Sequence, residues 1–277
     1  MRHETFPPDP AAANVVRLVL TFGDSSQAIG TAFLVSGPDC PHLVTALHNF
    51  TGGVSAMARK RGDRAPRKVL VTMYHGPDKV AAFSPYQGTQ GIFRMHPRPE
   101  ENDWCDIASV SCDALREWAA PEALDHPFWE LAGIDMPHTE KGYAQVEDMY
   151  LPTGKGALLF GFPGGRDYRE HPIGVSCALA AGLPRESYIL LSGHMHAGCS
   201  GAPVVAREFG GYFALREDGP VRTLRDTPVV DQWLGLYSGR LLDMGAPGLA
   251  SAETQVGVVW TPELVREVVD RGVPDSL

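Results

Sequence analysis

The sequence lacks the cysteine framework of a disulfide-stapled protein. Its five cysteines are an odd number and include no C-x-x-C pair; they are Cys40, Cys105, Cys112, Cys177 and Cys199. Secreted domains that depend on disulfides carry dense, even sets of cysteines, so this set predicts reduced thiols. Residues 1–10 also lack the basic and then apolar pattern of a secretory signal peptide. We therefore expect a cytoplasmic protein.

Long apolar runs and an excess of positive charge are missing as well. No apolar run reaches the roughly 20 residues that a membrane-spanning helix needs. The formal net charge is −9, with 24 Lys and Arg against 33 Asp and Glu, which argues against a surface for nucleic acid or anionic lipid. The basic run from Arg59 to Lys68 predicts a solvated loop. We expect neither nucleic acid nor a membrane as a partner.

Turn-forming residues are abundant. The 277 residues include 30 Gly and 23 Pro, and 44% are hydrophobic. This is too much Gly and Pro for a helical protein and too much apolar residue for a disordered one. Short apolar or alternating segments predict a first series of strands at 15–22, 29–35, 42–46, 68–74, 80–95 and 107–110. A second series is predicted at 157–161, 173–180, 188–192, 202–205, 233–237 and 255–260.

Two such series predict an all-β fold of two packed six-stranded antiparallel β-barrels. An amphipathic segment with Pro262 in its first turn adds a C-terminal helix. The expected units are a flexible arm, an N-terminal barrel, a connector, a C-terminal barrel and a helix with its tail, at residues 1–12, 13–112, 113–150, 151–261 and 262–277. A site between the barrels would draw on both.

The strongest candidate for such a site is the hexapeptide Gly-Cys-Ser-Gly-Ala-Pro at residues 198–203. Glycine on both sides of Ser200 permits otherwise strained dihedrals and a close approach of a substrate carbonyl. The N–H groups of Gly198 and Ser200 are therefore candidates for an oxyanion hole. The alternative is a plain turn between two strands, which is common for such sequences.

A serine nucleophile needs a base in reach and a third group that orients the base. His48 follows a predicted buried strand, and Asp106 precedes another. We predict that His48 takes the proton from Ser200 and that Asp106 holds the imidazole tautomer. Asp103 is a rival for the carboxylate. Cys199 is a rival for the nucleophile, but register disfavours it because Gly201 follows Ser200.

These segments resemble the motifs of trypsin-like (chymotrypsin-fold) serine peptidases. Residues 30–35 and 43–48 are similar to the family's GTGFLV and LVTAxH, residues 106–108 to its DIA, and residues 198–203 to its GxSGxP. The motifs follow in the family's order over most of the chain. The resemblance, which is greatest to single-domain bacterial members, implies a serine endopeptidase that works through an acyl-enzyme, without a metal or cofactor.

The resemblance also implies substrate-binding residues. Ser238, Gly239 and Arg240 would pair with the substrate backbone, and His194 and Tyr237 would line the specificity pocket. His194 stands where members specific for Lys or Arg carry an acid, and Tyr237 stands where acid-specific members carry a His. Medium-sized apolar or polar side chains are therefore expected in the pocket.

Two departures from the family concern regulation. Cys199 replaces the Asp that pairs with a newly cut N-terminus in zymogen-activated members, so we expect activity without such processing or control by a regulatory partner. Cys40 has no cysteine next to His48 to pair with, which agrees with a reducing compartment.

Two further motifs carry little weight. The spacing of His194, His196 and Cys199 matches no strong zinc pattern. Residues 161–166 lack the Gly-Lys-Ser/Thr ending of a phosphate-binding loop. Both are interpreted as pocket or turn residues, so no metal or phosphate ligand is expected.

The sequence predicts an endopeptidase for a protein or peptide substrate, with either a narrow substrate range or a gated cleft. Two alternatives stay open on the same scaffold. One is a catalytically silent pseudoprotease that holds a peptide or partner in the cleft. The other is an esterase or another acyl transferase.

Overall fold

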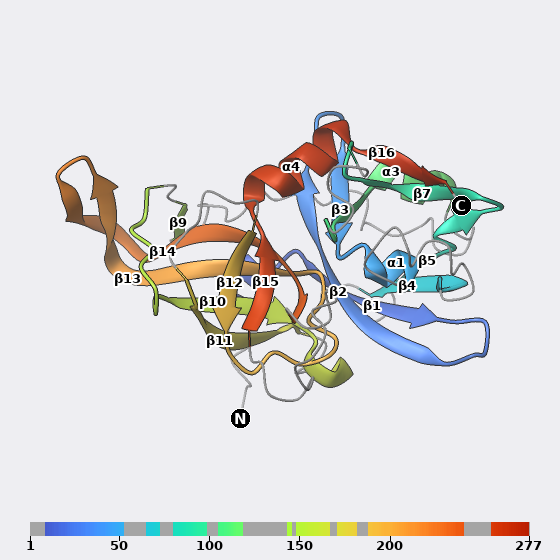
Figure 1. Ribbon diagram of the computed structural model, residues 1–277, viewed down its shortest axis with the longest axis horizontal. Coiled ribbons are helices and arrows are strands. Elements are labelled where there is room, and N and C mark those ends of the chain that lie inside the picture. Colours follow the sequence, from blue (N-terminus) through green and yellow to red (C-terminus); the bar gives the residue numbers. More distant parts are fainter. Residues whose placement is uncertain are drawn as a thin grey trace, which may run out of the picture.

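The computed structural model describes residues 9–52, 65–72, 80–98, 105–118, 143–145, 148–166, 171–181, 188–240 and 256–276. Most of them form strands, which assemble into two sheets that lie side by side with helix α4 (Pro262–Arg271) across the join (Figure 1). The predicted all-β fold with a C-terminal helix is confirmed. No described helix has the length and apolar character to cross a membrane.

The first sheet has the order β16-β7-β8-β3-β2-β1-β4-β5, with β6 paired to β7. Its strands are β1 (Val15–Thr21), β2 (Gln27–Ser36), β3 (Pro41–Thr45), β4 (Lys68–Thr72), β5 (Val80–Phe83), β6 (Tyr86–Gln87), β7 (Gln90–Met95), β8 (Ala108–Ser111) and β16 (Val273–Ser276). Within the described residues no pairing joins β5 to the other end, so this unit is a curled sheet where a closed six-stranded barrel was expected. Apolar side chains such as Leu18, Leu34 and Phe93 fill its inside.

The second sheet forms a ring. Its strands are β9 (Tyr143–Gln145), β10 (Gly156–Gly161), β11 (Ile173–Leu179), β12 (Tyr188–Ser192), β13 (Ala202–Arg216), β14 (Gly219–Arg240) and β15 (Val256–Trp260). The path runs β13-β10-β11-β12-β15-β14, and β14 pairs back with β13. The ring therefore closes with six strands, as predicted, while β9 adds to β14 in parallel.

The hairpin of β13 and β14 is much longer than the strands predicted at 202–205 and 233–237. Its outer half, around the Glu217-Asp218 turn, extends away from the ring at the left of Figure 1. Exposed apolar side chains gather there, with Phe209 and Leu224 each 72% exposed. Gly210 and Gly211, both with positive φ, accompany a β-bulge at this place. The outer parts of these strands were not predicted because their glycines and charged residues interrupt the apolar pattern.

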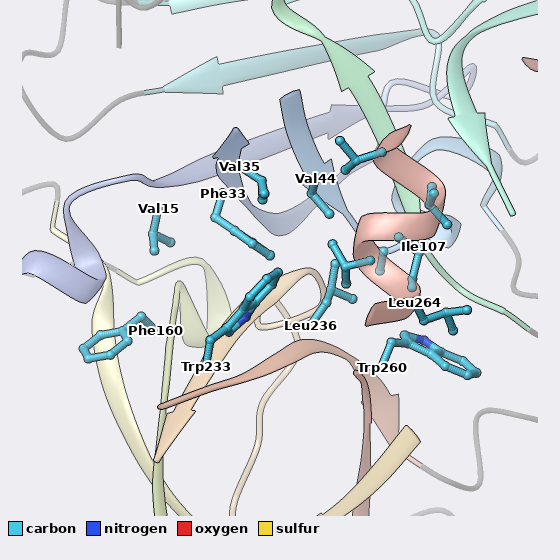
Figure 2. Close-up of a cluster of buried hydrophobic side chains, with 14 of the residues drawn as sticks. Val15, Phe33, Val35, Val44, Ile107, Phe160, Trp233, Leu236, Trp260 and Leu264 are labelled. Carbon is cyan, nitrogen blue, oxygen red and sulfur yellow. The ribbon is translucent and has the colours of Figure 1, made fainter. Parts of the chain in front are cut away.

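A shared apolar core joins the two sheets beneath α4. Leu264, Val265, Val268 and Val269 of α4 are buried, at a spacing that places them on one helix face. Figure 2 shows Phe33 of β2 pointing toward Trp233 of β14, and the two rings meet edge to face at 5.9 Å. This packing fixes how the two sheets sit against each other.

Both termini of the described chain are tied to the sheets. Pro10–Ala12 form a 3-10 turn whose Ala11 is fully buried in the shared core, and Arg207 binds both Asp9 and Asp231. After α4 the chain returns to the first sheet, where β16 pairs with β7. Of the predicted flexible arm, residues 1–8 lie outside the described residues, as do residues 119–142 of the predicted connector, which begins with α3 (Cys112–Trp118).

Candidate active site

The pairing of two strands of the first sheet brings His48 to Asp106. β3 pairs with β8 in antiparallel register, with Thr45 opposite Ala108. The ladder continues one step past the strands, where the Leu47 N–H donates to the Asp106 carbonyl at 3.3 Å. His48 is the next residue and begins the short helix α1 (His48–Thr51). His48 and Asp106 are thus adjacent because one follows β3 and the other precedes β8, at the same end of two paired strands.

The Asp106 carboxylate holds the imidazole of His48 in one orientation. Its Oδ2 lies 2.7 Å from His48 Nδ1, and its Oδ1 accepts the His48 backbone N–H at 2.8 Å. A carboxylate can only accept, so this contact places a proton on Nδ1, and the neutral ring then carries its lone pair on Nε2. Asp106 is fully buried, whereas the His48 side chain is 26% exposed. The arrangement suits a base that works at a solvent-facing edge.

The second sheet also reaches this carboxylate. The hydroxyl of Ser238, on β14, donates to Asp106 Oδ2. Ser238 was expected to bind substrate through its backbone; its side chain is buried and orients the carboxylate. Three donors, two from His48 of α1 and one from Ser238 of the second sheet, therefore converge on a buried carboxylate, which needs such partners.

Ser200 lies in the loop between β12 and β13, and both sheets hold this loop. The Ser200 carbonyl accepts the Thr31 N–H of β2 at 2.9 Å, and the Gly201 N–H donates to the Tyr237 carbonyl of β14 at 2.7 Å. Gly201 has φ +90°, and a Cβ on it would lie 2.0 Å from the Thr31 carbonyl oxygen. No other residue fits such a close approach.

The N–H groups predicted for the oxyanion hole are free to bind a ligand. Within the described residues, neither the Gly198 N–H nor the Ser200 N–H donates to a protein acceptor. The Gly198 carbonyl is turned to the Thr31 hydroxyl, which donates to it at 2.6 Å. Gly198 has φ +94°, and a Cβ on it would lie 2.2 Å from the Phe162 carbonyl oxygen. Glycine is required here too.

A cavity of about 860 Å³ opens beside His48, Gly198 and Ser200. Its other walls come from the β1–β2 turn of the first sheet and from Arg67. The volume lies within the range of roughly 300–1,000 Å³ typical of ligand pockets. The two halves of the predicted site thus face one open space.

The predicted specificity residues lie in different environments. His194 is exposed on the loop before Ser200, and Tyr237 is 3% exposed in the core of the second sheet. Gly239 and Arg240 continue β14 and pair with β15, Arg240 opposite Gly257. His194, Tyr237, Ser238 and Gly239 do not line the cavity beside His48.

Sequence reasoning missed a polar chain that links α1 to the serine loop. The Asn49 side-chain amide donates to Thr45 Oγ1 at 2.9 Å and to the Ser200 carbonyl at 3.1 Å. Thr45 Oγ1 in turn donates to the Thr31 carbonyl at 2.6 Å. The only available signal was the position of Asn49 directly after His48, because its partner is 151 residues away.

The structure also bears on the alternative candidates for the nucleophile and the carboxylate and on the possible metal site. Cys199 is fully buried, and burial raises the pKa of its thiol, which keeps it protonated. Asp103 lies outside the described residues. All five cysteines are free. In the part of the chain that the structure describes, no three His, Cys, Asp or Glu residues come together as a metal site.

Several solved structures are similar to this chain. The protease Rv3671c of M. tuberculosis in its active form is 16% identical, covers 97% of this chain and 90% of its own, and has a TM-score of 0.46. The protease Anisep of Arthrobacter nicotinovorans is 10% identical with 91% of both chains covered and a TM-score of 0.47. The serine endoprotease of Yersinia pestis is 11% identical, covers 95% of this chain and 68% of its own, and has a TM-score of 0.44.

No protein-family model and no curated protein matches the chain. The three solved structures named above are proteases, and the two sheets and the C-terminal helix of this chain form the all-β fold that its motifs predict. At identities of 10–16%, these structures do not show which residues of this chain are catalytic, so its chemistry is inferred from the side chains of the site.

Proposed function

We propose that the protein is a serine endopeptidase in which Ser200 is the nucleophile, His48 the base and Asp106 the orienting carboxylate. One observation supports this most: a buried carboxylate fixes the imidazole of His48, which shares one cavity with Ser200. A serine with a base oriented by a third group is the arrangement that nucleophilic catalysis needs.

In this mechanism Ser200 Oγ attacks the scissile carbonyl carbon while His48 Nε2 takes the hydroxyl proton. The oxygen of the tetrahedral intermediate is stabilised by the N–H groups of Gly198 and Ser200. The carbon–nitrogen bond then breaks as His48 returns the proton to the leaving amine. Water, activated by the same histidine, attacks the acyl-enzyme and restores the Ser200 hydroxyl.

The backbone of residues 238–240 is suited to hold an extended substrate. β14 pairs with β13 only as far as Tyr237, opposite Ala202, while its other edge continues with β15 to Arg240. Within the described residues, one edge of 238–240 therefore has no strand partner. A peptide can add to such an edge as a further strand, which favours a peptide over a small ester as the substrate.

Labelling with a fluorophosphonate probe, followed by intact-mass spectrometry, tests the proposal. We expect one adduct on the native protein and none on Ser200→Ala or His48→Ala. Ser176→Ala is the matched control, because Ser176 is an exposed serine on β11, and it should label as the native protein does. A well-folded native protein without an adduct would refute the proposal and favour the pseudoprotease.

Turnover of a peptide and of its matching ester by the native protein, not treated with the probe, then separates a peptidase from an esterase. We expect hydrolysis of both. Hydrolysis of the ester alone would leave the nucleophile in place but contradict the peptidase assignment.

A further inference from the structure

The two sides of Ser200 differ in the space that they offer a substrate. On the side of the second sheet, Met195 and Tyr237 are 2% and 3% exposed and belong to the core. A Cβ on Gly257 would lie 2.5 Å from Tyr237 Cε2 and 2.7 Å from Met195 Cε. These two side chains therefore occupy the space beside Gly257 and leave no pocket there.

On the side of the first sheet, the cavity of about 860 Å³ is open next to Ser200. Its wall includes Leu20, Phe22, Ala28 and Ile29 of the β1–β2 hairpin. Leu20 of β1 pairs directly with Ala28 of β2, Phe22 directly follows β1, and Ile29 follows Ala28 on β2. The cavity beside Ser200 thus has an apolar wall.

The direction of proton transfer assigns this cavity to the leaving group. Under the proposed function His48 gives its proton to the departing amine, so the amine must lie on the His48 side of Ser200. His48 and Asn49 of α1 line the cavity, whereas His194, Tyr237, Ser238 and Gly239 do not. The cavity therefore receives the residues that follow the scissile bond.

The charged residues of the cavity favour neither a positive nor a negative substrate side chain. The side-chain hydroxyl and the backbone N–H of Ser26 donate to Asp24, which lowers the pKa of this carboxyl and keeps it ionised. The Arg67 guanidinium packs against Gly23, because a Cβ on this glycine would lie 3.0 Å from Arg67 Nε. One negative and one positive group flank an apolar wall, which suits a neutral side chain.

We propose that this enzyme selects its substrate chiefly by a bulky apolar residue directly after the scissile bond, bound against Leu20, Phe22, Ala28 and Ile29. The inference rests on the proposed function and names the substrate class of the same site. It reverses the expectation that a pocket at His194 and Tyr237 determines specificity.

Acyl transfer to added amines measures the leaving-group side by itself. The acyl-enzyme is made from the p-nitrophenyl ester of N-acetylglycine, whose acyl part carries no side chain. An amino-acid amide then attacks the acyl carbonyl, loses a proton to His48, and forms a peptide bond as Ser200 Oγ leaves and is reprotonated. The ratio of peptide to hydrolysis product reports how well the amide binds.

We expect leucinamide and phenylalaninamide to be captured at least about tenfold better than glycinamide, since filling an apolar pocket gives discrimination of this order. Ala28→Leu should reduce capture of leucinamide about fivefold or more by filling the cavity. Phe22→Ala, which enlarges the cavity, should shift the preference to tryptophanamide and serves if Ala28→Leu does not fold. Ala180→Leu, at a partly buried alanine outside the cavity, is the matched control and should behave as the native protein.

Each outcome decides a different point. An acyl-enzyme that partitions equally among the amides, or whose preference survives both cavity variants, would overturn this inference and leave the proposed function intact. Failure of the native protein to form an acyl-enzyme would overturn both.

Discussion

The first sheet buries polar groups that point toward the serine loop, whereas the buried charges of the second sheet bind one another. His48, Asn49 and Asp106 of the first sheet and α1 form hydrogen bonds at the join. In the second sheet Arg207 lies between Asp231 and Asp9. The serine loop itself packs on the second sheet through Met195 and Cys199, in an apolar core.

This difference indicates a division of labour. Proton transfer needs oriented polar groups next to open space, and the first sheet supplies both. A nucleophile needs a rigid support, and the closed ring of the second sheet supplies a packed core. Under the proposed function, substitutions of the polar groups at the join should therefore change reactivity, whereas breaking the Arg207 ion pair of the second sheet should change stability.

The largest effect is expected from Asp106→Asn. The amide preserves the shape of the carboxylate but favours the wrong tautomer of His48, so the labelling rate should fall by about four orders of magnitude. The labelling rate is measured by quenching the fluorophosphonate reaction at a series of times. Asp113→Asn, at an exposed carboxylate of α3 paired with Arg116, is the control; equal rates in the two variants would contradict the role of Asp106.

Arg207→Met tests the second sheet. It leaves Asp231, which is fully buried, without its counter-charge, and should lower the free energy of unfolding by about 3–5 kcal/mol. The folded fraction should label at the native rate. Urea unfolding measures the loss, and Arg222→Met, at an exposed arginine of the same hairpin, should cost less than about 0.5 kcal/mol. A loss of reactivity at full stability would reverse the assignment of roles.

His42 should make stability fall with acid. Burial, assisted by Arg94, lowers the pKa of His42 from 6.5 to about 4, while its Nδ1 lies 2.8 Å from Ser109 Oγ. A depressed pKa favours the neutral form in the folded state, so its contribution is complete above pH 6.5 and lost between pH 6.5 and 4. The loss is about 3 kcal/mol.

The difference in unfolding free energy between the native protein and His42→Asn should therefore shrink by that amount from pH 7 to pH 4. The nearby carboxylates, which oppose the shift, are those of Asp39, Asp113 and Asp270. His194→Asn, at an exposed histidine, is the control. A difference that stays constant with pH would show that His42 is not held neutral.

The smallest effect is expected from Asn49→Ala. It removes one of two donors to the Ser200 carbonyl and should slow labelling about tenfold, as expected for about 1.4 kcal/mol. The pH at half-maximal rate should not move, because His48 and Asp106 are intact. Thr51→Val, which removes a hydroxyl bonded to Leu47 within the same helix, should cost stability without slowing labelling. A shifted pH profile would assign Asn49 a different role.

Features that depend on neighbouring residues could be predicted from the sequence. Val15 to Phe22 is apolar at every position except Arg17 and Thr21, and it forms β1 within a residue of the prediction. Ser200 and His48 could be chosen as candidates because glycine flanks the serine and the histidine follows a predicted strand. In both cases the signal and the structure lie within about ten residues.

Contacts between distant segments could not be predicted in this way. Ser238 reaches Asp106 over 132 residues, and Asn49 reaches Ser200 over 151. The return of β16 to the first sheet depends on α4 crossing the join. The filling of the space beside Gly257 depends on Met195 and Tyr237 meeting from different segments, so the sequence pointed to a pocket where the structure has a core.

The most direct test of the account is whether a base from the first sheet and a serine from the second act as one unit. The measurement is the kcat for p-nitrophenyl butyrate of the native protein, Ser200→Ala, His48→Ala and the double variant. We expect each single variant to lose at least about a thousandfold and the double variant to lose no more than the worse single one, because groups that act together are not additive. Losses that multiply in the double variant, or a single variant with the native rate, would contradict the account.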